Sequence, residues 1–73
     1  MAHETKEERF KRIVEKRVQL VLDDLKKLSQ CANKRMYAWD DEQLGKIWYA
    51  IDDAVQKCRN SFRDAEDNGQ FRL

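Results

Sequence analysis

The chain has 73 residues, of which 41% are apolar and 40% are charged, and its formal net charge is +1. It contains two glycines and no proline, a composition that argues against a β-rich fold with several tight turns. No stretch approaches the roughly 18 apolar residues that a membrane-spanning helix needs. We therefore predict an all-α protein with a single domain, residues 1–73.

Residues 5–31 are predicted to form the first helix. Thr5 and Glu8 have the spacing of a capping box, in which each side chain accepts a backbone N–H of the other residue. The apolar residues that follow are spaced four and three apart, which is the heptad spacing of a narrow helix stripe. We call this stripe the first seam: Val14, Val18, Val21, Leu25 and Leu28.

Residues 32–39 lose this period and are predicted to connect two helices, with Asn33 in a left-handed conformation after the first. Asp40 is the expected N-cap of a second helix, residues 41–66, and Gln43 completes its capping box. The tail, residues 67–73, is expected to fray. The heptad stripe of the second helix, here called the second seam, consists of Leu44, Trp48, Ile51, Val55, Cys58, Phe62 and Ala65.

The short connection predicts that the two helices return side by side as an antiparallel hairpin with heptad-like seams. Two helices bury only one side of each other, and a domain of this size gains little stability from its own core. We therefore expect a homodimer that forms a four-helix bundle. A different partner on the same face and a lone hairpin are the alternatives.

The two cysteines, Cys31 and Cys58, fall on or near the seams. In the predicted hairpin they lie about 20 Å apart along the helices, too far for an intrachain disulfide. We expect both thiols to be buried as small apolar groups. The first ten residues are charged and lack the apolar region of a secretory signal, so the expected location is the cytoplasm.

Charge is distributed unevenly along the chain. Residues 1–36 hold ten basic and six acidic side chains, whereas residues 37–73 hold five basic and eight acidic ones. This complementarity suits packing of one half on the other, within a chain or in a dimer. The basic cluster of the first helix could alternatively contact nucleic acid, and it could also be neutralised by its interleaved glutamates. Its candidate nucleic-acid-binding residues are Arg9, Arg12, Lys16 and Arg17.

Aromatic and basic side chains gather around the connection. Trp, Tyr and Arg are enriched at the energetic centres of protein interfaces, so this end of the hairpin is the predicted partner-binding site. Packing of Tyr37 and Trp39 over the end of the bundle is the alternative interpretation. The candidate partner-binding residues are Arg35, Met36, Tyr37, Trp39, Lys46 and Tyr49.

Catalytic and metal-binding patterns are weak. His3 is the only histidine, and no base–nucleophile pair accompanies it in the sequence. The Asp pairs at 23–24 and 52–53 lack the Glu-x-x-His motif of di-iron bundles, and adjacent helical residues diverge by about 100°. We therefore expect no catalytic residues, no metal site and no cofactor.

The stretch around the connection has a recognisable order: a Leu-rich helix, an Asn-containing turn, a Tyr-x-aromatic pair, an acidic cap and a Lys-Ile-aromatic helix. This pattern resembles uncharacterised small helical proteins encoded on plasmids, integrative elements and phages, mainly of Gram-positive bacteria. The resemblance covers roughly residues 17–62 and departs from the pattern at Gly45 and Cys31. It is carried by Arg17, Val18, Asn33, Tyr37, Trp39, Asp40, Lys46, Ile47, Trp48, Ala50, Ile51 and Phe62.

The resemblance implies an accessory role on a mobile element, such as regulation of a partner or counter-defence, and it implies no catalytic residue. Together with the aromatic and basic residues, it leads us to expect a non-enzymatic protein–protein interaction module. An inhibitor of a host defence complex, such as an anti-CRISPR-type protein, is one form of this expectation. A small nucleic-acid-binding regulator that uses the basic first helix is the alternative.

Overall fold

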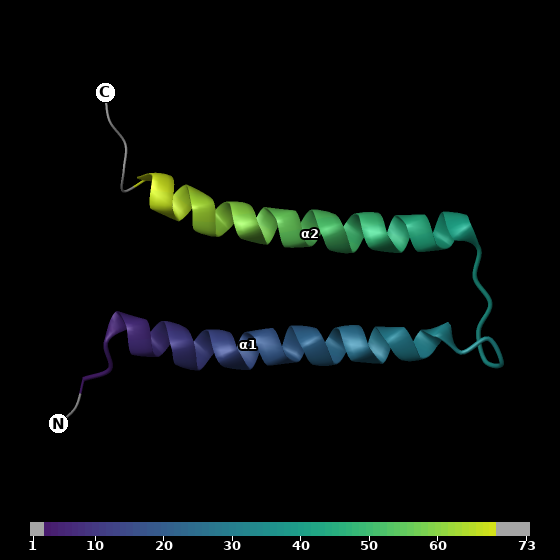
Figure 1. Ribbon diagram of the computed structural model, residues 1–73, viewed down its shortest axis with the longest axis horizontal. Helices are drawn as coiled ribbons and strands as arrows, with labels where there is room; N and C mark the ends of the chain where they lie inside the picture. Colours follow the sequence, from purple (N-terminus) through teal and green to yellow (C-terminus); the bar gives the residue numbers. More distant parts are fainter. Residues whose placement is uncertain (1–2, 69–73) are drawn as a thin grey trace. The chain divides into compact units, whose positions relative to one another are not determined.

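The computed structural model describes residues 3–68, and their side chains as far as residue 66. These residues form two α-helices, α1 (Lys6–Ser29) and α2 (Asp41–Asn68), with a short 3-10 helix, η1 (Gln30–Ala32), after the first (Figure 1). No residue from 3 to 68 lies in a strand. The all-α prediction is confirmed.

The chain divides into two units, Met1–Ala38 and Trp39–Leu73, and each unit contains one long helix. The first unit holds α1, η1 and the turn that follows them. The second holds Trp39 and α2. The single domain, the antiparallel hairpin and the four-helix bundle remain predictions.

The capping box at the start of α1 is confirmed. The Glu8 backbone N–H donates to Thr5 Oγ1 at 3.1 Å, and the Thr5 N–H donates to Glu8 Oε1 at 3.3 Å. These bonds satisfy backbone donors that have no partner within the helix. Helix α1 therefore begins at Lys6, one residue after the predicted start.

The end of α1 differs from the prediction. The α-helix stops at Ser29, and η1 continues the chain to Ala32 in a tighter turn. Asn33 has an extended conformation (φ −79°, ψ 103°), so the predicted left-handed cap is wrong. The Ser29 hydroxyl donates to the carbonyl of Lys26 at 2.6 Å, and the Gln30 N–H reaches the carbonyl of Lys27. The carbonyls of Lys26 and Lys27, in the last turn of α1, thus accept hydrogen bonds without a left-handed residue.

Helix α2 starts where the sequence predicts. The Gln43 N–H donates to Asp40 Oδ1 at 2.7 Å, and the Asp40 N–H donates to Gln43 Oε1 at 3.0 Å. The helix continues to Asn68, two residues beyond the predicted end, so the expectation of a frayed tail is wrong for residues 67 and 68. The rest of the predicted tail, residues 69–73, lies outside the described residues.

No residue from 3 to 66 is fully buried, so this part of the chain has no hydrophobic core of its own. Val18, Val21 and Leu25 of the first seam are exposed, and Trp48 of the second seam is 49% exposed. Cys31 and Cys58 are free and exposed, which corrects the expectation of buried thiols. Both helices therefore carry apolar surface that the described residues do not cover.

Candidate functional site

Three of the predicted partner-binding residues lie in the turn after η1. The carbonyl of Asn33 accepts the backbone N–H groups of Met36 and Tyr37 at 3.1 and 3.0 Å. The Asn33 side-chain oxygen accepts the N–H of Arg35 at 3.0 Å. These bonds close a turn that leaves Tyr37 exposed and Met36 70% exposed.

The other three predicted partner-binding residues belong to the second unit. Trp39 is half-buried immediately before the N-cap of α2. Lys46 is exposed and forms an ion pair with Glu42 at 3.6 Å. Tyr49 is 76% exposed. Because Lys46 and Tyr49 are three residues apart on a helix, they lie on the same side of α2.

The predicted partner-binding set is therefore divided between the two units, with Arg35, Met36 and Tyr37 in the first and Trp39, Lys46 and Tyr49 in the second. Within the first unit, one turn brings its three residues together. Within the second, Lys46 and Tyr49 share one side of α2. The union of all six into one binding surface remains a prediction.

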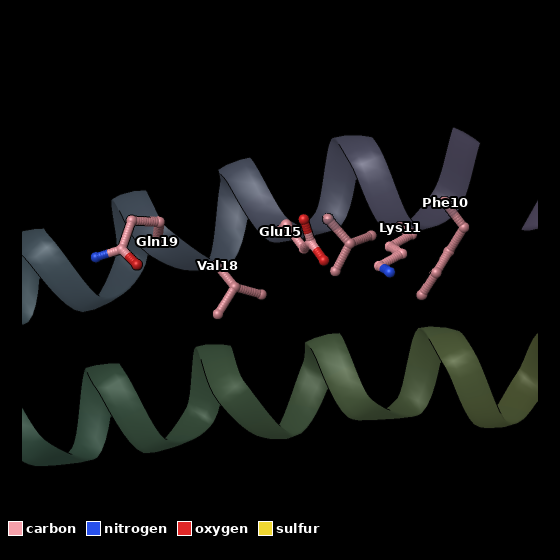
Figure 2. A pocket seen from close by; sticks show the side chains of 6 residues that line it. Phe10, Lys11, Glu15, Val18 and Gln19 are labelled. Carbon is pink, nitrogen blue, oxygen red and sulfur yellow. The ribbon is translucent and has the colours of Figure 1, made fainter. Parts of the chain in front are cut away.

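A shallow, mainly apolar depression lies on α1, along the N-terminal part of the first seam. Figure 2 shows its side chains, with the apolar Phe10 and Val18 interspersed with polar residues on one stretch of the helix. An apolar stripe bordered by charged residues is the usual appearance of a helix face that packs against another helix. The lining residues are Phe10, Lys11, Val14, Glu15, Val18 and Gln19.

The basic cluster of α1 is partly neutralised by one carboxylate that precedes the helix. Arg12 donates to both carboxylate oxygens of Glu4, from Nε at 2.7 Å and from Nη2 at 3.0 Å. Arg9 Nε lies 3.6 Å from the same carboxylate. The hydrogen bonds and positive charge of Arg12 lower the pKa of Glu4, and the Glu4 carboxylate raises the pKa of Arg12.

This arrangement affects the alternative nucleic-acid site. Arg9 and Arg12 are both engaged by Glu4, whereas Lys16 and Arg17 form no ion pair with any residue from 3 to 66. Only half of the predicted nucleic-acid-binding set is therefore free of competing carboxylates. Glu8, one turn before Arg12, takes part in the capping box, and Arg12 pairs with Glu4 instead.

Within the part of the chain that the structure describes, no three His, Cys, Asp or Glu side chains are placed to hold a metal ion. Neither α1 nor α2 has a stretch long and apolar enough to span a bilayer.

A surface beside the second seam lies on α2, on the side where the sequence pattern predicts that Ile47 and Ala54 widen the seam. Successive residues of a helix are rotated by about 100° around its axis, so Lys57 and Glu66 lie on opposite sides of α2, about 180° apart. The half of the α2 surface between them that contains the second seam has no charged residue from 41 to 66. On α1, the part of the helix surface around the first seam that lies between charged residues is narrower. It spans about 120°, from Arg17 to Lys11, and it contains Glu7 of the first turn. The uncharged half of α2 is thus wider than a single heptad seam.

Apart from Gln43 of the capping box, the part of this uncharged half outside the second seam is made of small or medium-sized residues. We call it the Ala54 face, and all four of its members are exposed. In the sequence, this face can be detected because its four residues are uncharged and follow one another at spacings of three, four and seven residues. The Ala54 face consists of Ile47, Ala50, Ala54 and Ser61.

Comparison with protein-family models, curated proteins and solved structures found no match to the chain.

Proposed function

We propose that the chain is a non-enzymatic interaction module that binds another protein. The observation that supports this best is the amount of large apolar surface, with Met36 70% and Tyr49 76% exposed and no buried core among residues 3–66. Exposed apolar residues of this size, beside basic side chains, are typical of protein-binding surfaces.

The binding surface in this proposal is formed by the residues around the connection: Arg35, Met36, Tyr37, Trp39, Lys46 and Tyr49. The aromatic rings and the methionine supply apolar contact area, and the basic residues form a polar rim. Binding would act by blocking a surface of the partner or by stabilising one of its conformations. The second mechanism requires a higher affinity for that conformation than for its alternative.

The resemblance to small proteins of plasmids, integrative elements and phages supports a specific setting for this activity. In this setting the partner is a host complex, and inhibition of a defence complex by an anti-CRISPR-type protein is the most specific form of the proposal. Such a role requires no catalytic group, cofactor or metal ion from the chain. The proposed location is the cytoplasm of the host cell.

The proposed architecture is an antiparallel hairpin that dimerises into a four-helix bundle. The exposed seams on both helices support it, because each seam has the width that one neighbouring helix covers. A dimer would also cover apolar surface that a lone hairpin leaves in water.

Affinity capture with matched variants tests the partner-binding proposal. The wild-type protein, Tyr49→Ser and the control Gln56→Ser would each be used as bait in an extract of the source bacterium. We expect one stoichiometric protein partner with the wild type and the control, and at least a tenfold smaller yield with Tyr49→Ser. Circular dichroism would verify that all three baits are equally helical. Failure of the wild type to retain any stoichiometric protein would contradict the proposal.

The second candidate is a small nucleic-acid-binding regulator. The observation that favours it is that Lys16 and Arg17 are adjacent, exposed and without an ion pair among the described residues. Binding to phosphates through these residues would weaken steeply with salt. Gel shifts at low and moderate salt with Lys16→Gln and Arg17→Gln would test it. Retention of binding by the double variant would count against this candidate.

A further inference from the structure

We propose that two copies of the chain pair through the Ala54 face, with their α2 helices antiparallel and a two-fold axis passing close to Ala54. This inference depends on the self-association included in the proposed function. It adds the contact surface, the orientation and the residues that meet. The occupant of this face is a second copy of the same chain.

The width of the uncharged surface on α2 is the first reason. A helix that packs against one neighbour needs an apolar stripe of about 100°, whereas the uncharged half of α2 spans about 180°. The second seam accounts for one neighbour. The remaining part, which holds the Ala54 face and Gln43, covers about 80° between Lys57 and Ala65, somewhat less than one full stripe, and it contains no charged residue that such contact would desolvate.

The side chains of the Ala54 face suit close contact between helices. Ala50 and Ala54 are small, so two helix axes can approach at the lower end of the usual 8–10 Å range. The Ser61 hydroxyl donates to the carbonyl of Lys57 at 3.2 Å within the same helix. Ser61 can therefore enter an apolar contact with its hydroxyl already satisfied.

Antiparallel pairing produces a consistent register. With Ala54 on the two-fold axis, Ala54 lies opposite Ala54 of the second copy. Ile47 then lies opposite Ser61 of the second copy, and Ala50 lies opposite Cys58. A larger residue on one helix thus meets a smaller residue on the other, which is the arrangement that fills space between packed helices.

Charge complementarity is the second reason, and it identifies the occupant. The charged edge of the Ala54 face contains Lys46, Asp53, Lys57 and Asp64. A two-fold axis perpendicular to antiparallel helices brings the same edges of both copies together. Lys46 and Asp64 of the second copy then lie at nearly the same height along the helix axis, with a difference of about 3 Å. Asp53 has the same relation to Lys57 of the second copy.

In a parallel pair, the two-fold axis would run along the helices and bring opposite edges of the two copies together, so this charged edge would lie beside the second seam without opposite charges to pair with. Within one chain, Asp53 and Lys57 already form an ion pair at 2.9 Å. Near the axis the charges of the two copies follow the order Lys57, Asp53, Asp53, Lys57, so each Asp53 lies within about 3 Å, along the helix axis, of both Asp53 and Lys57 of the second copy. In the antiparallel pair, the four contacts between opposite charges therefore outnumber the one contact between like charges, which is that of the two Asp53 residues at the axis.

Disulfide trapping tests the register directly. Ala54→Cys would be introduced into a chain without native thiols (Cys31→Ser, Cys58→Ala), with Gln56→Cys in the same background as the matched control. A disulfide requires Cα atoms within about 7 Å, a separation that the axis allows at residue 54. Residue 56 lies about 150° from the centre of the Ala54 face. We expect a covalent dimer from Ala54→Cys in a glutathione buffer, and at least tenfold less from Gln56→Cys.

The other outcomes separate this inference from the proposed function. A dimer by sedimentation in which the Ala54→Cys thiol stays reduced, or in which Gln56→Cys cross-links equally well, would overturn the α2 pairing and leave the interaction module intact. A wild-type protein that is monomeric at all concentrations would overturn the pairing as well. Circular dichroism of each variant would show whether its helices are retained.

A charge exchange tests the pairing without changing its apolar residues. Lys46→Asp and Asp64→Lys should each raise the dimer dissociation constant about tenfold, because each places like charges together at two symmetric positions. The double variant should return to within about threefold of the wild type. Lys26→Asp on α1 is the control and should change it less than about twofold. Additive weakening in the double variant would overturn the pairing.

Discussion

Glu4 has an unusual position for a residue that supports a helix, because it precedes the first helical residue and binds side chains further along. Its carboxylate accepts two hydrogen bonds from Arg12 and lies near Arg9. The two arginines project toward the N-terminus of α1, as helical side chains do. Glu4 thereby fixes the approach of the chain to the first turn, in addition to the capping box at Thr5 and Glu8.

The first prediction concerns the pH dependence of this contact. The pKa of Glu4 is lowered from its ordinary value of 4.5, mainly by the Arg12 hydrogen bonds. A carboxylate with a lowered folded-state pKa stabilises the fold above its unfolded-state pKa, and this contribution disappears as the pH falls through the folded-state value. We expect the Glu4 carboxyl resonance to titrate below pH 4.5, with loss of helicity in the first turn of α1 over the same range.

Two variants provide the controls for this titration. Glu4→Gln should remove the acid-dependent change in the first turn, because the neutral amide has no proton to gain. Arg12→Gln should move the Glu4 pKa back toward 4.5, since its main cause of lowering is removed. A Glu4 carboxyl that titrates at or above 4.5 in the wild type would show that the contact does not form in solution.

The second prediction concerns Gly45. A Cβ atom at this position would meet no atom within 4 Å. Glycine in an exposed helix interior is less favourable than alanine by about 1 kcal/mol. Gly45→Ala should therefore raise the free energy of unfolding by about this amount in urea denaturation. The substitution should leave self-association unchanged, because residue 45 lies about 170° from the centre of the Ala54 face. Destabilisation would indicate a close neighbour at Gly45.

At the scale of the elements, the helix starts are determined by local hydrogen bonds that the sequence reveals. Both capping boxes, at Thr5–Glu8 and Asp40–Gln43, are formed as predicted from residue type and spacing alone. They could be predicted because donor and acceptor lie three residues apart. The helix start depends little on tertiary contacts.

The end of α1 could not be predicted in the same way. Asn33 is compatible with a left-handed cap, and the sequence does not show that η1 would come first. In the structure, Asn33 uses its carbonyl and its side-chain oxygen to hold the following turn. Asn residues favour both arrangements, so residue type alone does not distinguish them.

The third prediction tests the cap of α2. Asp40→Ala removes the acceptor of the Gln43 N–H and should destabilise the first turn of α2 by about 1 kcal/mol. Asp40→Asn keeps a side-chain oxygen at the same position and should cost only a fraction of this. Amide hydrogen exchange of residues 42–44 measures the difference. Equal protection in the wild type and Asp40→Ala would mean that the cap contributes nothing to the stability of α2.

At the scale of the whole molecule, the helical composition and the two seams follow from the sequence because they depend on residue spacing along one helix. The candidate site follows less completely. The exposure of Met36, Tyr37 and Tyr49 is compatible with the predicted partner-binding surface, but the partner's identity is determined by chemistry outside this chain. The heptad pattern predicts only that Ile47 and Ala54 widen the second seam, because it depends on large apolar residues, whereas the Ala54 face is marked by small residues and missing charges.

The uncharged half of α2 also relates the self-association to the four-helix bundle. In the proposed pair, the Ala54 faces meet at the axis, and the second seams of both copies remain on the same side. That side is then available to the first seams of the two α1 helices. Dimerisation through α2 and packing of α1 on the second seam are therefore compatible within one assembly.

The central claim is that apolar helix surface left exposed in one copy is covered by another copy, and sedimentation equilibrium tests it most directly. Measurements between about 1 and 100 μM cover the range in which a modest helical dimer dissociates. We predict a concentration-dependent mass that approaches twice the 8.8 kDa of a single chain. A constant mass of 8.8 kDa across this range, in a protein that remains helical, would contradict the account.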